Sequence, residues 1–250
     1  MQHLVGWFQD VDQAAAAADI AAISDDTLFA QGDIIRVPEE MSNVMAVACI
    51  TAAVTFTSAQ LQSPSLRQLA NMDILPVVRA AVFGSSPALM DLSKNPFALI
   101  PNESLTFNTN TDDAAVIEIY GLLWLTDGPA VPVSGEIFTV RATAAIVLAG
   151  GAWINGNLTF SQDLPFGDYD VVGMRAESAN LLCARLVFPG KPWRPGVPGA
   201  NVPGDIDHPL FRMGAGGIMG SFNTNNPPTV DMIGISDSAE NVLLDLIKRG

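Results

Sequence analysis

Residues 135–148 read GEIFTVRATAAIVL, and this stretch predicts one long β-strand. Every second residue from Phe138 to Leu148 is apolar. Successive side chains of a strand point to opposite faces, so these residues would form one continuous apolar face. The alternate positions carry an arginine and two threonines among apolar residues, with Arg141 at the middle. We therefore expect the first face to line a core and the second to be partly covered.

Similar runs extend on both sides of this strand, and they predict an all-β protein. A series of strands with almost no helix between them is typical of a sandwich or a barrel. The long connection over 84–103 argues against an up-and-down barrel, so we expect an eight-stranded jelly-roll sandwich with two four-stranded sheets. The eight predicted strands span 43–57, 74–83, 104–108, 114–125, 135–148, 157–161, 169–176 and 180–188.

The N-terminal residues 1–32 differ from this pattern. Asp10 and Gln13 fit a capping arrangement, and five consecutive alanines follow. This segment predicts a helix over residues 11–23. Because an isolated helix of that length is marginal in water, we expect it to lie on the body of its own domain or on a neighbouring subunit.

The C-terminal part of the chain predicts an extended tail. Residues 189–235 are rich in proline and glycine, which do not suit a central strand, yet they carry many large apolar side chains. Residues 238–248 predict a short helix, preceded by a second capping box. The expected domains are therefore an N-terminal arm with a helix over 1–32, a jelly-roll β-sandwich over 33–190, and a tail over 191–250.

The composition indicates a folded protein with an unusually uncharged surface. Of the 250 residues 49% are hydrophobic, which excludes a disordered chain, and 15% are charged. A typical domain has about 25% charged residues, so much of the surface is neutral. This favours assembly with other subunits, and a compact monomer with a polar, uncharged surface is the alternative.

The net charge of −14 argues against two classes of partner. Nucleic-acid binders carry a basic stripe that displaces counterions from phosphates, and no such stripe is present. The same acidity disfavours docking on anionic lipids. No apolar run reaches about 18 residues and no secretory signal is seen, so we expect no membrane insertion.

Residues that could carry chemistry are few. A metal site in a jelly roll would need several convergent histidines, and the chain has only His3 and His208. The segment Asp205–His208 could ligate a cation through its carboxylates, although a solvated loop is the favoured interpretation. Neither a Gly-x-Ser-x-Gly elbow nor a phosphate-binding loop occurs. We expect no catalytic, cofactor-binding or metal-ligating residue, and no cofactor.

The two cysteines, Cys49 and Cys183, lie within apolar strand patterns. Both are expected to be small buried side chains. A disulfide would require the two strands to lie close together, and the sequence leaves this open.

The eight strand runs between Asn43 and Phe188, with arms at 1–32 and 189–250, resemble the single jelly-roll coat proteins of icosahedral viruses. The resemblance implies a structural protein, not an enzyme, that self-assembles in the host cytoplasm into the capsid of a virion. Its partners would be copies of itself and other capsid proteins, joined through sandwich edges and exchanged terminal arms. Because the chain lacks a basic arm, the resemblance is to membrane-containing or layered capsids, in which another layer faces the genome.

Exchanged arms would need apolar anchors that insert into a neighbouring subunit. Candidate anchors on the N-terminal arm and the C-terminal tail are Trp7, Phe8, Ile20, Ile23, Trp193, Phe211, Phe222, Leu243 and Ile247.

Two alternatives remain open at this point. One is a carbohydrate- or receptor-binding β-sandwich module of the spike or fibre type. Such a module uses exposed aromatic side chains, and only 7% of the residues are aromatic. The other is a hydrolase built on a jelly roll, which would need a convergent polar pocket.

Overall fold

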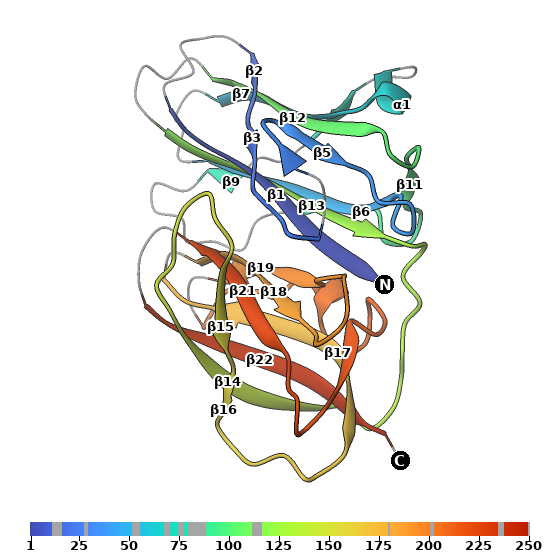
Figure 1. Cartoon of the computed structure of the whole chain (residues 1–250), viewed down its shortest axis with the longest axis vertical. Coiled ribbons are helices and arrows are strands. Elements are labelled where there is room, and N and C mark those ends of the chain that lie inside the picture. The colour runs from blue at the N-terminus through green and yellow to red at the C-terminus, as the bar shows by residue number, and fades with distance from the viewer. Residues whose placement is uncertain are drawn as a thin grey trace. The chain divides into compact units, whose positions relative to one another are not determined.

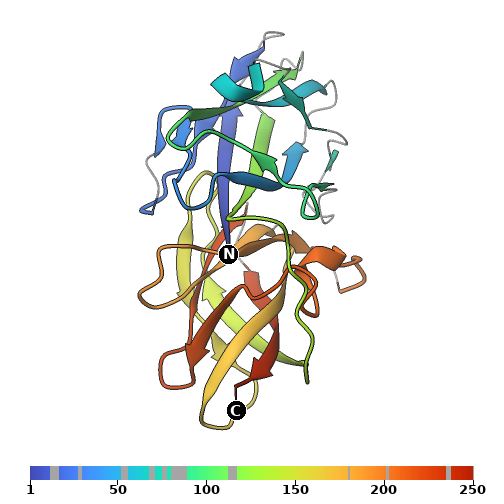
Figure 2. The same ribbon diagram turned by 90° about the vertical axis from the view of Figure 1, so that its right-hand side faces the viewer.

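The computed structural model of the chain describes residues 1–11, 17–27, 30–51, 56–67, 71–74, 78–79, 89–111, 117–179, 181–200, 203–234 and 238–249. This part is β-structure almost throughout (Figures 1 and 2). The helical elements within it are one turn, α1 (Pro64–Arg67), and a 3-10 helix, η1 (Pro209–Phe211). No helix in these ranges has the length and apolar character needed to cross a membrane. The prediction of an all-β sandwich protein is confirmed.

The chain forms two compact units. Leaving aside residues 84–86, which lie outside the described chain, the N-terminal unit runs from Val5 to Gly128. The C-terminal unit runs from Pro129 onward and includes Met1–Leu4. The predicted division into one sandwich over 33–190 with two arms is wrong. Each half has enough strands for a core of its own, and the boundary lies at the Asp127-Gly128-Pro129 turn, which local sequence cannot distinguish from a turn within one sandwich.

The N-terminal unit contains two sheets. The first has the order β10 (Met90–Asp91), β6 (Asn43–Thr51), β13 (Ile117–Thr126), β1 (Gln2–Val11) and β3 (Ala21–Ala22), and β9 (Val78–Arg79) and β11 (Phe97–Ala98) also pair with β6. The second has the order β4 (Ala30–Gln31), β5 (Ile34–Arg36), β12 (Ser104–Thr111), β7 (Phe56–Gln62) and β8 (Met72–Asp73), and β2 (Ala18–Asp19) pairs with β12.

Phe107 shows how these two sheets pack. Its ring comes from β12 in the second sheet and lies 5.6 Å from the ring of Trp7 in β1 of the first sheet, measured between centroids. A Cβ atom placed on Gly121 of β13 would lie only 2.7 Å from the same ring. The two sheets therefore face each other, and glycine at position 121 leaves the room that the ring occupies.

The C-terminal unit also contains two sets of strands. One has the order β16 (Thr159–Phe160), β14 (Phe138–Ile146), β22 (Ser238–Lys248), β17 (Asp168–Glu177) and β20 (Gly220–Asn223). The other has the order β15 (Ile154–Asn157), β21 (Thr229–Gly234), β18 (Leu181–Val187) and β19 (Gly196–Ala200). A short parallel pairing of β19 with β17 joins the two sets into one continuous sheet.

The two units share the same strand connectivity. In the C-terminal unit the main strands in chain order are β14, β15, β17, β18, β19, β20, β21 and β22. In the N-terminal unit the corresponding strands are β1, β5, β6, β7, β8, β10, β12 and β13, and the two-residue strands β2, β3, β4, β9 and β11 are additional to them. In one sheet of each unit, the strands lie side by side in the order first, eighth, third and sixth. In the other set of strands, the order is second, seventh, fourth and fifth.

The strand predicted from residues 135–148 is β14. The first face is buried as expected, at Val140, Ala142, Ala144 and Ile146. Phe138, at the start of the strand, is the exception because 37% of its surface is exposed. The expectation that the second face is partly covered is wrong for this chain, because Thr139, Arg141, Thr143 and Ala145 are exposed. The strand lies between β22 and β16.

The predicted C-terminal helix over 238–248 is wrong, because these residues form β22. The apolar run fits two periodicities. Val242, Leu244 and Leu246 alternate as in a strand, whereas Val242, Leu243, Leu246 and Ile247 would form one stripe of a helix. In the structure the three alternating side chains are completely buried. Long antiparallel ladders to β14 on one side and to β17 on the other decide in favour of the strand.

The predicted N-terminal helix over 11–23 is wrong in its described part, and residues 12–16 lie outside it. Val11 ends β1, and β2 and β3 follow, paired with β12 and β1. Here strand pairing overrides the helix propensity of alanine. The C-terminal tail predicted over 191–250 likewise contributes four strands, β19 to β22, although Pro198 lies in β19. The ladders of β19 are only three and two residues long, which limits the cost of the missing N–H group.

Candidate functional site

The two histidines have structural contacts. His3 is completely buried, and its Nδ1 atom accepts a hydrogen bond of 2.9 Å from the backbone N–H of Arg194. His208 stands at the start of η1, where its side chain accepts a bond from the N–H of Leu210. Within the described ranges, no group of three or more histidine, cysteine or acidic side chains is arranged to hold a metal ion.

The cysteines are free and buried. Cys49 belongs to β6 and Cys183 to β18, so they lie in different units. Burial raises the pKa of both thiols, and that of Cys183 is raised to about 12 although the nearby Arg185 acts to lower it. Neither side chain has the character of a reactive thiolate.

The segment Asp205–His208 is held by two arginines. The carboxylate of Asp207 pairs with the guanidinium groups of both Arg175 and Arg212. Arg175 also donates a hydrogen bond of 2.8 Å to the backbone oxygen of Asp205. These contacts tie the segment to β17 and satisfy the carboxylate that a cation would have used.

Arg212 extends this ionic network to the centre of a sheet. Its Nε and Nη2 atoms donate to the two oxygens of Asp245 at 2.9 and 3.2 Å, and Asp245 in β22 has no exposed surface. The same carboxylate accepts bonds from the hydroxyl of Thr139 and the backbone N–H of Met213. Burial alone raises the pKa of Asp245, but these four hydrogen bonds outweigh it and hold the pKa below its usual value.

A second buried ionic cluster fixes the beginning of the chain to the C-terminal unit. Asp231 of β21 accepts bonds from Arg185 at 3.0 Å and from Arg194 at 3.1 Å. Arg185 also donates to the backbone oxygen of Leu4, and its guanidinium carbon lies 3.8 Å from the centre of the Trp153 ring. Both networks join separate segments of the C-terminal unit through their charged side chains.

The nine predicted arm anchors lie within the strands and loops of their own units. Five of them are buried, and the other four are half-buried. The buried ones are Trp7, Ile20, Ile23, Phe211 and Phe222; the half-buried ones are Phe8, Trp193, Leu243 and Ile247.

Several of these anchors pack against specific partners. The indole N–H of Trp7 donates to the backbone oxygen of Asp33, and Phe8 packs on Tyr120. Trp193 meets His3 edge to face at 5.6 Å. Exchange between subunits would require these side chains to leave the units that they now fill.

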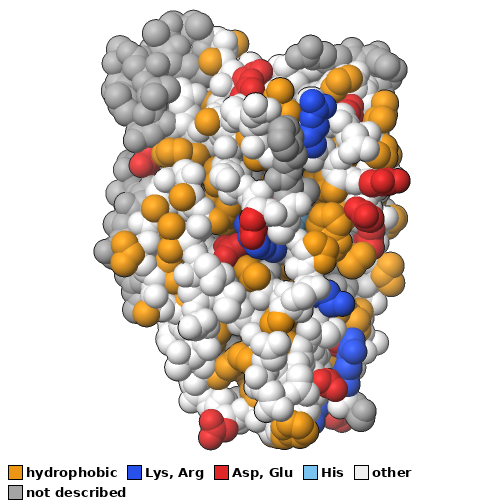
Figure 3. Space-filling view, viewed as in Figure 1, with side chains coloured by type: hydrophobic (Ala, Val, Ile, Leu, Met, Phe, Trp, Pro, Cys, Tyr) orange, Lys and Arg blue, Asp and Glu red, His pale blue; other side chains and the backbone are white. Residues whose placement is uncertain are grey.

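One apolar patch is exposed on the C-terminal unit. Val131, Met213 and Ile218, here called the apolar patch, are 71%, 52% and 42% exposed. They lie on two adjacent segments, since the N–H of Val133 donates to the oxygen of Gly214 at 2.9 Å. Figure 3 shows one face of the molecule, on which charged side chains are few and hydrophobic ones are scattered among uncharged groups.

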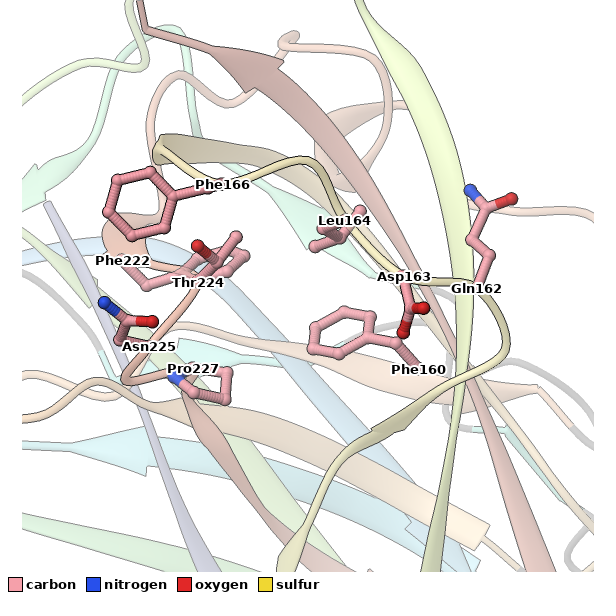
Figure 4. Close-up of a pocket in the computed structure, with 9 residues that line it drawn as sticks. All are labelled: Phe160, Gln162, Asp163, Leu164, Phe166, Phe222, Thr224, Asn225 and Pro227. Carbon is pink, nitrogen blue, oxygen red and sulfur yellow. The ribbon is translucent and has the colours of Figure 1, made fainter.

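A pocket of about 470 Å³ opens between two loops of the C-terminal unit. One loop follows β16 and the other joins β20 to β21. Phe160 and Phe166 lie at opposite sides of the opening, with Leu164 between them (Figure 4). Phe166 is 73% exposed, whereas Phe222 is buried and stacks on Phe160 with 6.3 Å between ring centroids. The pocket is lined by Phe160, Gln162, Asp163, Leu164, Phe166, Phe222, Thr224, Asn225 and Pro227.

Sequence reasoning missed this pocket. It assigned Phe222 to an arm and did not consider Phe160 or Phe166. The usable signal was an aromatic residue in a polar loop, at Asp163-Leu164-Pro165-Phe166. The buried network at Asp245 also had a signal, because an acidic residue interrupts the apolar run over 242–247.

Comparison with known proteins gives one structural similarity. No family model matches the sequence, and no curated protein matches it. Among solved structures, the major capsid protein P2 from bacteriophage PM2 is similar, with 9% sequence identity and a TM-score of 0.28 over 99% of this chain and 97% of that chain. The resemblance is architectural. A TM-score of this size does not establish a common fold, so the similarity says nothing about residues or function.

Proposed function

We propose that this protein is a structural subunit of a viral capsid, and that each of its two units is a jelly roll. The observation that carries the proposal is the connectivity. The order first, eighth, third, sixth in one sheet and second, seventh, fourth, fifth in the other is that of a jelly roll, a fold of viral capsid proteins. Because this order occurs in both units, the subunit would be a tandem pair of jelly rolls, whereas the sequence led us to expect a single one. A fold does not dictate a function, so the surface of the subunit must also fit the role.

The surface properties support association with further subunits. Only 15% of the residues are charged, and the apolar patch of Val131, Met213 and Ile218 is open in the isolated chain. Exposed apolar groups that lie together mark sites of protein–protein contact. Copies of the chain, with other capsid proteins, would meet through such patches and through sandwich edges.

A structural role in a capsid shell also fits the described residues, among which no metal-binding cluster is found. The buried carboxylates of Asp231 and Asp245 are paired with arginines. The net charge of −14 disfavours direct contact with the genome. The subunit would act without catalysis, within the virion, with another layer between it and the nucleic acid.

Sedimentation velocity of the full chain at increasing concentration tests the contact surface. The unmodified chain should form large species, and Ile218→Asp should shift the distribution toward smaller ones because a charge would be buried at the interface. Asn157→Asp introduces the same charge at an exposed polar position and is the matched control. Equal sedimentation of all three proteins would remove the apolar patch from the proposal.

A further inference from the structure

We propose that the pocket between the loops after β16 and β20 binds a neutral sugar residue. Its volume of about 470 Å³ is within the range of small-molecule sites, about 300–1,000 Å³. The exposed ring of Phe166 forms one wall, and Phe160 with Phe222 forms the other side and the base (Figure 4). This inference does not depend on the proposed capsid role.

Hydrogen bonds hold the ends of the two loops that line the pocket. At one end of the first loop, the N–H and hydroxyl of Ser161 both donate to the backbone oxygen of Arg141 at 2.9 Å. Near the other end, the hydroxyl of Tyr169 donates to the oxygen of Pro165 at 2.7 Å.

The second loop is held just as firmly. The N–H of Thr224 donates to the oxygen of Gly167 at 3.1 Å, which joins the two loops directly. The side-chain oxygen of Asn223 accepts the N–H of Asn225, and its backbone oxygen accepts the N–H of Asn226. A preformed site loses less conformational entropy on binding, which favours recognition of a small ligand.

The chemistry of the lining matches a sugar ring. The C–H groups on one face of a pyranose can pack on an aromatic ring, whose face is electron-rich. The hydroxyl groups at its edge need acceptors and donors, and Asp163 and Asn225 supply a carboxylate and an amide. Both side chains are exposed, and neither polar end is hydrogen-bonded to another described residue. In Figure 4 the Asp163 carboxylate lies beside the Phe160 ring, whereas Gln162 points away from the rings.

The same lining disfavours two other ligands. An anionic sugar would meet the Asp163 carboxylate with no lysine or arginine in the lining, on a chain of net charge −14. A purely apolar anchor, such as a leucine side chain of a peptide, would cover the carboxylate without offering a donor, which costs free energy.

Saturation-transfer NMR on the full chain tests the inference, with the methyl glycosides of glucose, galactose, mannose and N-acetylglucosamine as probes and sialyllactose as the anionic comparison. At least one neutral glycoside should bind saturably. Phe166→Ala should weaken its binding roughly three- to tenfold, the range expected for loss of one aromatic contact. Asp163→Asn should also weaken it. Val147→Ala truncates another exposed apolar side chain of the same unit, outside the pocket, and should leave binding unchanged.

Because Phe166 and Asp163 are exposed, both variants should fold, and the dispersion of their amide NMR signals verifies this. Three outcomes would overturn the inference: no neutral glycoside binds, binding is the same in Phe166→Ala and Asp163→Asn as in the unmodified chain, or sialyllactose binds better than the neutral sugars.

Discussion

The carboxylate of Asp245 is completely buried in β22 and accepts two hydrogen bonds from the guanidinium of Arg212, at 2.9 and 3.2 Å. This pair joins the loop before β20 to the middle of a sheet. Removing one partner of a buried pair leaves the other charge uncompensated, which costs about 3–5 kcal/mol. Because Arg212 is partly exposed, we expect Asp245→Ala to lower the free energy of unfolding of the C-terminal unit by about 3 kcal/mol.

Urea denaturation followed by hydrogen exchange measures this loss and assigns it to a unit. Exchange should accelerate in β14, β17 and β22 and remain unchanged in the N-terminal unit. Glu136→Ala removes an exposed carboxylate of the same unit and should change stability by less than about 0.5 kcal/mol. Similar effects of the two substitutions would show that the Asp245 pair contributes little.

The same carboxylate predicts an acid dependence of stability. The pKa of Asp245 is lower in the folded chain than in the unfolded chain, where an aspartate carboxyl has a pKa of about 3.9. The stabilisation is therefore fully present above that value and is lost as the pH falls through the lower folded pKa. Urea midpoints measured from about pH 7 to about pH 2 should fall at the acid end, and less steeply in Asp245→Asn. Parallel curves for the two proteins would contradict this assignment.

The sequence predicts an element well when the spacing of its apolar residues fits a strand or a helix but not both. The strand β14 was predictable because its alternation continues without interruption from Phe138 to Ile146. The strand β22 was not, because its apolar residues also fit a helical stripe and only its partners, β14 and β17, decide between them. The five alanines after Gln13 favour a helix by their intrinsic propensity. The last of them, Ala18, nevertheless lies in a strand, as do Asp19, Ala21 and Ala22, because these residues pair with β12 and β1.

Gly121 offers a test of the packing between the sheets of the N-terminal unit. A Cβ atom at this position would lie 2.7 Å from the ring of Phe107, so the ring or the strand must move. We expect Gly121→Ala to destabilise the N-terminal unit by about 1–3 kcal/mol, the usual cost of overpacking a core. Thermal unfolding measures the loss.

The control for this change is Gly128→Ala, because a Cβ atom there would have no neighbour within 4 Å. A smaller side chain opposite Gly121 should relieve the clash, so Phe107→Leu combined with Gly121→Ala should lose less stability than the sum of the two single changes. Strict additivity would mean that Phe107 is not the source of the strain.

The cysteines should report on unfolding. Burial raises the pKa of Cys183 to about 12 and raises that of Cys49 as well, so little thiolate exists at neutral pH. We expect both thiols to resist iodoacetamide in the native chain and to react in urea, with mass spectrometry counting the adducts. Rapid alkylation of either thiol without denaturant would contradict its burial.

The candidate pocket was less predictable than the fold. Phe160 and Phe166 are close in the sequence, but Phe222 is far from both. It reaches them because β20 pairs with β17 and because the Gly167–Thr224 bond joins the two loops. The two-unit architecture was hidden for a similar reason. Strand connectivity is defined by pairings such as β14 with β22, which join residues about a hundred positions apart, and no local pattern encodes them.

Electron microscopy of the purified full chain tests the capsid proposal most directly. If the chain is a tandem jelly-roll coat subunit, negative-stain images at high protein concentration should show shells or extended sheets of regularly spaced subunits, and Ile218→Asp should reduce them. A chain that stays monomeric and featureless at every concentration, alone and when expressed together with the other proteins of its source, would contradict the account.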